Sequence, residues 1–289
     1  MPIHAREQSD PTRNRRRLFA WPAVALVVLV LVSCHASPGS LPVVAAAPDW
    51  VSTLPATHET LSAVLAAFSA EEQSQAWNAA RADALRGYLA DLARCGPMSR
   101  PELFPSNEAA LAYLVDAHIA WTLALGHAGR LSKLGVDGLR QEPVAIDGRT
   151  SSLRGLMEEL ARRAPWEPRL ALFLNAGWRG GPPFPPSAVE GRSLEWQLTL
   201  QAERCGKSSG FWTLDAPARR LGVSAYTELM WGLPPAQPAR TRRLLDLVPP
   251  PDAIREAVFA ACGASLQRCV VVLTPVDTGR LFTPPESDY

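Results

Sequence analysis

The sequence lacks the spacings that mark common metal and phosphate sites. It contains no H-E-x-x-H zinc motif, no zinc-finger arrangement of Cys and His, and no C-x-x-C pair. The glycine-rich stretch Gly177–Gly181 matches neither G-x-G-x-x-G nor a P-loop, because no Lys-Ser/Thr pair follows it. We therefore expect no metal and no cofactor in this protein.

The sequence also lacks a strong net charge. Its formal charge is +1 at pH 7, and no basic stripe interleaved with aromatic residues occurs beyond the N-terminus, which argues against nucleic-acid binding. The composition is 47% hydrophobic and 20% charged, as in globular proteins that bury a core. A chain of 289 residues is long enough for one large domain or two small ones.

A basic cluster followed by an apolar run opens the chain. Four arginines within residues 13–17 precede residues 18–33, which carry no charge. This order predicts an export signal over residues 1–33, since the apolar run is short for a membrane-spanning helix of about 20 residues. The signal holds five arginines and two acidic residues, so the positive balance of the chain belongs to it.

The end of this segment, Leu31-Val32-Ser33-Cys34, resembles the lipobox of bacterial lipoproteins. The resemblance implies cleavage before Cys34 and lipid attachment to its thiol, with residues 34–56 as a flexible tether rich in Pro and Ala. The alternative is an uncleaved signal anchor. Both interpretations predict an extracytoplasmic, membrane-anchored protein whose partners are the membrane and a protein or peptide of the cell envelope.

Four cysteines follow the signal, at positions 95, 205, 262 and 269. An oxidising compartment permits disulfides between them, and the sequence alone does not choose among the three pairings of four thiols. We expect one bridge between Cys262 and Cys269, because a predicted helix ends at the first and a predicted strand begins at the second. The alternative is buried free thiols, and without a His cluster a zinc site is not expected.

Hydrophobic periodicity predicts a helix-rich α+β fold with a small β-sheet, in a single domain over residues 57–282 with a loose tail at 283–289. Helices are expected over 61–68, 77–94, 106–123, 152–164, 194–205, 225–230 and 253–261. Ser106 and Ser152 are expected as N-caps. Strands are expected at 144–146, before an Asp147-Gly148 turn, at 170–174 and at 270–273.

Three ordered stretches resemble one protein family. They are the apolar segment 111–120, the strand-and-helix segment 144–158, and the segment 168–183, which contains L-N-A-G and a Pro-Pro pair. In this order they resemble domain-of-unknown-function family 547, whose patterns run roughly F-W-x-N-x-Y-N-A, then a helix ending in an acidic-His pair, then L-N-C-x-x-x-S-C-P-P. The resemblance covers residues 85–232 and implies a divergent member of that family.

The chain departs from this family where the chemistry matters. The helix His of the family falls on Glu158, its two loop cysteines fall on Ala176 and Gly181, and its Asn and Tyr fall on Asp116 and His118. A Cys, a His and an Asn brought together suggest thiolate catalysis in the family. Because this chain lacks both the nucleophile and the base, the resemblance implies a domain that retains binding rather than thiol chemistry.

The candidate pocket implied by the resemblance consists of Asp116, His118, Glu158, Asn175, Trp178 and Arg179. Asp116 and His118 diverge by about 200° on a helix, so at most one of them faces a pocket easily. His118 is more typical of a core or surface histidine. Glu158 and Glu159 also point in different directions, which favours a solvated helix face.

Three of these residues lie in the loop that begins at Leu174. Asn175 either orients a ligand or ties down the loop. Trp178 is either a stacking platform or a plug in the space that a lost thiol leaves, and we favour the plug. Arg179 either binds an anion through the glycine-rich turn or is a solvated side chain.

Three functions remain open from the sequence. The first is a membrane-tethered, extracytoplasmic lipoprotein whose degenerate, non-catalytic domain acts in binding or assembly in the cell envelope. The second is a re-tooled hydrolase of an envelope polymer or peptide that uses Asp116 and Glu158 as a carboxylate pair. The third is a purely structural exported protein. Convergence of the candidate residues on one open cleft would favour the second function over the first.

Overall fold

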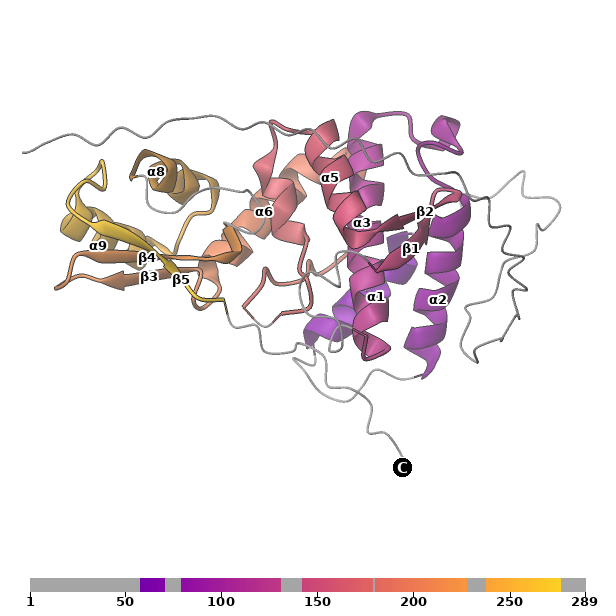
Figure 1. The fold of residues 1–289 in the computed structure, drawn as a ribbon, viewed down its shortest axis with the longest axis horizontal. Helices are drawn as coiled ribbons and strands as arrows, with labels where there is room; N and C mark the ends of the chain where they lie inside the picture. Colours follow the sequence, from indigo (N-terminus) through magenta and orange to yellow (C-terminus); the bar gives the residue numbers. More distant parts are fainter. Residues whose placement is uncertain (1–57, 71–78, 131–141, 179, 228–237, 277–289) are drawn as a thin grey trace, which may run out of the picture. The chain divides into compact units, whose positions relative to one another are not determined.

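The computed structural model describes residues 58–70, 79–130, 142–178, 180–227 and 238–276 (Figure 1). These residues form a helix-rich α+β fold with two small sheets, where the sequence predicted one. The predicted signal, Cys34, the tether, Arg179 and the C-terminal tail lie outside the described residues, as do residues 228–230 of the helix expected at 225–230.

The N-terminal helices pack around one long central helix. The elements are α1 (His58–Ala70), α2 (Ala79–Arg94), the short 3-10 helix η1 (Pro101–Leu103), α3 (Asn107–His127) and α5 (Leu153–Arg163). The Ser106 side chain caps α3 by accepting from the Ala109 N–H, as expected, and α3 packs against α2 and α5. α3 is long and apolar enough to cross a membrane by composition alone, but 89% of its apolar window is buried inside the protein, as in a core helix.

A two-stranded hairpin, β1 (Pro143–Ile146) with β2 (Arg149–Ser152), lies between α3 and α5 in the sequence. Its turn is the expected Asp147-Gly148 pair, and both residues have positive φ, at 53° and 70°. Asn, Asp and Gly favour such turns because they tolerate this backbone conformation. The Asp147 carboxylate accepts from the N–H groups of Met98 and Ser99, so the turn is fastened to the loop after α2.

The strand expected at 170–174 is wrong. The segment forms the 3-10 helix η2 (Pro168–Phe173), whose first residue is a proline and whose N-terminal N–H of Arg169 is capped by the Glu167 carboxylate. Its residues 170–173 are all buried. A short run that is buried on every side shows no periodicity, so its pattern does not separate a buried strand from a buried helical turn.

The C-terminal half contains a mixed three-stranded sheet in the order β3-β4-β5. Its elements are η3 (Gly191–Ser193), α6 (Leu194–Lys207), β3 (Trp212–Asp215), β4 (Arg220–Ser224), α8 (Pro238–Leu247), α9 (Asp252–Cys262) and β5 (Val270–Thr274). β3 and β4 are antiparallel, whereas β5 runs parallel to β4. The sequence predicted β5, α6 and α9 but not the β3–β4 hairpin.

α6 joins the two hydrophobic clusters of the protein. Leu194 and Leu198 belong to a first cluster with α1, α2, α3 and α5, whereas Ala202 and Cys205 belong to a second cluster with the mixed sheet, α8 and α9. The successive turns of one amphipathic helix therefore contribute to both clusters. The 3-10 helix η2 also contributes to both clusters, through Leu170 and Phe173 to the first and through Leu172 to the second.

The predicted disulfide is present between Cys262 and Cys269, which joins the end of α9 to the residue before β5. Cys95 is a half-buried free thiol and Cys205 is a fully buried one. Burial raises the pKa of the Cys205 thiol to about 12, so this thiol stays protonated and unreactive.

Thiol counting checks this pairing. In the exported Cys34→Ala variant, denatured without reductant, we expect two reactive thiols, those of Cys95 and Cys205. Reduction before denaturation should raise the count to four in a matched sample. Four thiols in the unreduced sample would contradict the bridge.

Candidate functional site

Asn175 is fully used in holding the loop in which it lies. Its Oδ1 accepts from the N–H groups of Gly177 (2.7 Å) and Trp178 (3.0 Å). Its Nδ2 donates to the carbonyls of Pro182 (2.6 Å) and Trp178 (3.3 Å). The side chain is buried and offers no unpaired group to a ligand. Of the two roles considered for it, tying down the loop is the one that the structure shows.

Neighbouring elements fasten both ends of this loop. The Gln201 side chain of α6 donates to the carbonyls of Leu172 and Pro183, at 2.9 and 2.6 Å. The Tyr226 hydroxyl donates to the carbonyl of Leu174. These bonds satisfy backbone carbonyls that lack a regular secondary-structure partner, so the loop is held in place without regular secondary structure.

Trp178 is buried, with 8% of its surface exposed, so it does not offer an open face for stacking, and the plug stays the favoured interpretation. Gly181 follows three residues later, and a Cβ placed on it would lie 2.9 Å from Asn175 Oδ1. A cysteine at this position, where the resembling family carries one, would have to displace the asparagine that organises the loop. Ala176, at the other matched position, is half-buried beside Asn175.

Glu158 does not face the interior. Its side chain is 64% exposed on α5 and pairs with Arg154 one turn earlier, at 2.7 Å. Its neighbour Glu159 is the buried carboxylate and binds Arg149 and Arg163. Burial alone would raise the pKa of Glu159, but the hydrogen bonds from both arginines outweigh it and lower the pKa below its ordinary value. The adjacent pair diverges, as helix geometry requires.

His118 is a neutral core histidine. It is buried within α3, and desolvation lowers its pKa to about 3, so the imidazole carries no charge at neutral pH. Its Nδ1 has no hydrogen-bond partner among the described residues. A ring without charge or access to solvent does not serve as an acid or base for an external substrate.

Asp116 is completely buried in the middle of α3 and connects three segments. Its Oδ2 lies 3.1 Å from Nδ1 of His58 at the start of α1, and its Oδ1 accepts from the Val189 N–H at 2.8 Å. Desolvation raises the pKa of Asp116, which the bonds from His58 and Val189 partly oppose. The hydrogen bond to Asp116 is the main cause of a raised pKa at His58.

The segment next to Val189 is bound from both sides as well. The Ala188 N–H donates to Ser62 Oγ of α1 at 3.0 Å, while Gln197 of α6 accepts from the Glu190 N–H and donates to the Ala188 carbonyl. Asp116, Ser62 and Gln197 thereby fix residues 188–190 against α1, α3 and α6.

His58 lines an open pocket of about 880 Å³ at the shared end of α1, α2 and α3. The same pocket is lined by Tyr88, Cys95, Tyr113 and Glu190. The His58 side chain is 47% exposed, and the contact of its Nδ1 with Asp116 fixes the ring. A half-exposed imidazole oriented by a buried carboxylate is suited to proton transfer. His58 was missed in the sequence because a lone histidine at the start of a helix carries no motif.

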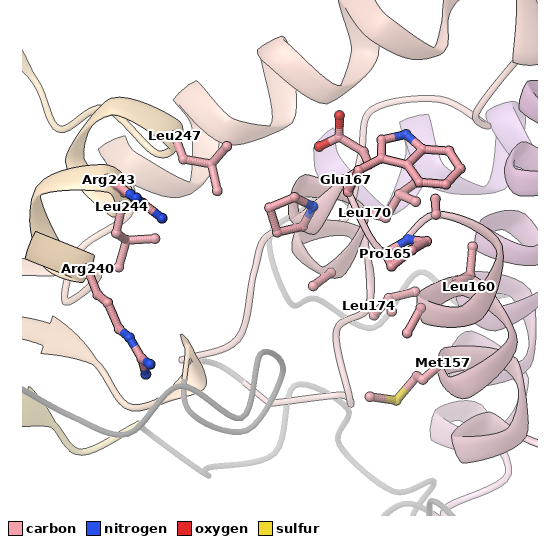
Figure 2. A pocket seen from close by; sticks show the side chains of 15 residues that line it. Met157, Leu160, Pro165, Glu167, Leu170, Leu174, Arg240, Arg243, Leu244 and Leu247 are labelled. Atoms are coloured by element: carbon pink, nitrogen blue, oxygen red, sulfur yellow. The ribbon is translucent and has the colours of Figure 1, made fainter.

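A second pocket, of about 760 Å³, lies between α5 and η2 on one side and α8 on the other. Figure 2 shows Arg240, Arg243, Leu244 and Leu247 on the α8 side, facing a wall that includes Leu160 and Leu174. Apolar side chains make up most of the lining. Of the six residues predicted as a site, the five that the structure describes line neither pocket, and Arg179 lies outside the described residues.

One catalytic pattern in the sequence is explained by the fold. Residues 206–210 read G-x-S-x-G, a pattern that marks a nucleophile only where a strand turns sharply into a helix. Here it lies at the C-terminal end of α6, and the Ser208 hydroxyl donates to the Cys205 carbonyl at 2.6 Å. Ser208 therefore closes a helix and does not form a nucleophile elbow.

The described residues contain no group of three or more His, Cys, Asp or Glu side chains arranged to hold a metal ion. Comparisons with protein-family models, with curated proteins and with solved structures found no match for this chain. The site is therefore interpreted from its geometry.

The contact between Gly181 and Asn175 is testable by a double-mutant cycle. We expect Gly181→Ala to destabilise the fold by about 1–3 kcal/mol through overpacking, and Asn175→Ala by about 1–3 kcal/mol through unpaired N–H groups. The double variant should be destabilised by less than the sum of the two single effects, because removing the Asn175 amide removes the atoms that the new Cβ meets. Urea unfolding measures each value.

Gly87→Ala in α2 is the matched control for this cycle. A Cβ at Gly87 meets no atom within 4 Å, so this substitution should leave stability unchanged or raise it by up to about 1 kcal/mol. Strict additivity of the Gly181 and Asn175 substitutions would contradict the contact.

The His58–Asp116 pair predicts a histidine that titrates above its ordinary pKa of 6.5. Since the folded-state pKa is raised, the stabilisation by protonated His58 is fully present below about pH 6.5, and it is lost as the pH rises through the folded-state pKa. NMR titration of the imidazole should show a lower pKa in Asp116→Asn. His127, whose pKa burial lowers, serves as an internal reference. An unchanged His58 titration in the variant would contradict the pairing.

Proposed function

We propose that this chain is a membrane-tethered, extracytoplasmic lipoprotein whose domain, a divergent relative of family 547, acts in binding or assembly in the cell envelope. The signal-like residues 1–33 and the lipobox-like Cys34 support the tether. Partners of the domain are expected to be the membrane and an envelope component that the domain binds without covalent chemistry.

One observation carries the binding role: the loop that resembles a thiol site is closed on itself. Asn175 makes its hydrogen bonds inside the loop, and Trp178 is buried. Gly181 packs against Asn175 with no space for a side chain. Glu158 is turned to solvent. A nucleophile, a base and a substrate have no common space there, which argues for loss of the family's thiol chemistry and retention of its scaffold.

A second candidate, hydrolysis of an envelope polymer or peptide, is favoured by the pocket at His58. The expected partner of Asp116 was Glu158, but the structure pairs Asp116 with His58 instead. In this role His58 would take a proton from water as it attacks and return it to the leaving group. If wild type and His58→Gln cleave envelope polymers and peptides equally, or if wild type cleaves none of them, the hydrolase function is excluded.

Metabolic labelling with a palmitate analogue tests the tether. The wild-type protein should incorporate the label and fractionate with membranes, whereas Cys34→Ala should remain unlabelled and uncleaved. Cys95→Ala, which removes a free thiol in the described domain, is the matched control and should keep the label. Unlabelled wild-type protein would remove the lipoprotein claim.

A further inference from the structure

The pocket between α5, η2 and α8 has a mostly apolar lining. Met157 and Leu160 of α5, Leu170 and Leu174 at η2, and Leu244 and Leu247 of α8 all line it. α8 is anchored independently of any ligand, because Leu244 packs in the second hydrophobic cluster and Trp212 Nε1 donates to the Val248 carbonyl at 3.0 Å. The α8 wall of the pocket is therefore fixed by contacts within the protein.

Two arginines give this pocket a positive charge. Arg240 and Arg243 line it from α8 and make no ion pair with any described residue. The one carboxylate in the lining, Glu167, is engaged by Arg169, which binds both of its oxygens, at 2.8 and 2.6 Å, and also binds Glu195 at 2.9 Å. Arg242, on the same helix, pairs with Asp246 and does not line the pocket. The uncompensated charge is thus concentrated on the pocket side of α8.

An exposed tryptophan extends the apolar surface to the rim. Trp166 lines the pocket from the turn between α5 and η2, and 71% of its surface is in contact with solvent. Aromatic side chains left exposed beside an apolar hollow are typical of binding surfaces rather than of isolated surface positions. The volume of about 760 Å³ lies within the range of small-molecule sites, about 300–1,000 Å³.

We propose that this groove binds an anionic amphiphile, with a single alkyl chain along the leucines and Trp166 and a phosphate or carboxylate headgroup at Arg240 and Arg243. The positive charge of the two arginines indicates an anionic headgroup, because guanidinium groups bind phosphate and carboxylate oxygens through charge-assisted hydrogen bonds. The wall offers few polar side chains beyond these arginines and the engaged Glu167, so a peptide backbone would find few partners. The inference rests on the proposed binding role and names its ligand class.

Photolabelling of the full chain in dodecyl maltoside tests the groove, since this neutral detergent already supplies an uncharged alkyl chain in excess. The probe is a dodecyl phosphate that carries a diazirine on its chain. We expect labelled peptides to map to residues 157–174 and 240–247. Replacing both groove arginines, in Arg240→Gln/Arg243→Gln, should lower the labelling about tenfold or more.

Arg242→Gln is the matched control, because it removes one arginine from the same helix outside the groove, and it should keep the labelling. Ala161→Phe, which places a ring in the groove and leaves the charges intact, should lower the labelling even if the double variant fails to fold. Equal labelling by a dodecyl maltoside probe, equal loss in Arg242→Gln, or label spread evenly over the chain would overturn the inference.

The photolabelling of the groove and the palmitate labelling of Cys34 test different proposals and can fail independently. Failure of groove labelling with palmitate incorporation intact removes the ligand class and leaves the tethered lipoprotein. Specific groove labelling without palmitate incorporation would contradict the lipid tether and would leave the proposed ligand class in place.

Discussion

A single buried carboxylate organises the N-terminal half of this protein. Asp116 lies in the middle of the central helix, where its charge is costly unless hydrogen bonds compensate for lost hydration. His58 and the Val189 N–H supply them, so burial of the carboxylate is tied to the positions of α1 and of residues 188–190. Removing either partner would leave a buried acceptor unsatisfied, at a cost of about 1–3 kcal/mol. The pocket at His58 exists because these three segments meet there.

In the loop over residues 174–189, neutral buried polar groups also require hydrogen-bond partners. The described residues of this loop form no strand or long helix, so side chains satisfy their backbone groups: Asn175 from within, and Gln201 and Tyr226 from outside. The tight turn around Asn175 leaves no volume at Gly181. The described part of this loop is held by its own hydrogen bonds, and the two pockets described above lie elsewhere, at His58 and between η2 and α8.

Several elements were predictable because their determinants are local. Ser106 and Ser152 cap helices, Asp147-Gly148 forms the hairpin turn, and Cys262 and Cys269 are joined across a short reversal, each within a few residues of chain. The buried segment 170–173 was predicted as a strand because a uniformly apolar run lacks the period that separates the two structures. The β3–β4 hairpin was missed for the related reason that β4 is buried over four consecutive residues and shows no alternation of apolar and polar positions.

The sequence by itself determined the helix-rich α+β class, the capped helix starts and the divergence of His118 from Asp116, since each depends on neighbours along the chain or on helical period. It favoured the Cys262–Cys269 disulfide without fixing it, and the structure chose that pairing. Only the tertiary structure decided which residues share a space. It paired Asp116 with His58, 58 positions away, turned Glu158 to solvent, enclosed Trp178 and placed Arg240 and Arg243 opposite Leu174. Such pairings arise from packing between distant segments, and one sequence carries no local pattern that records them.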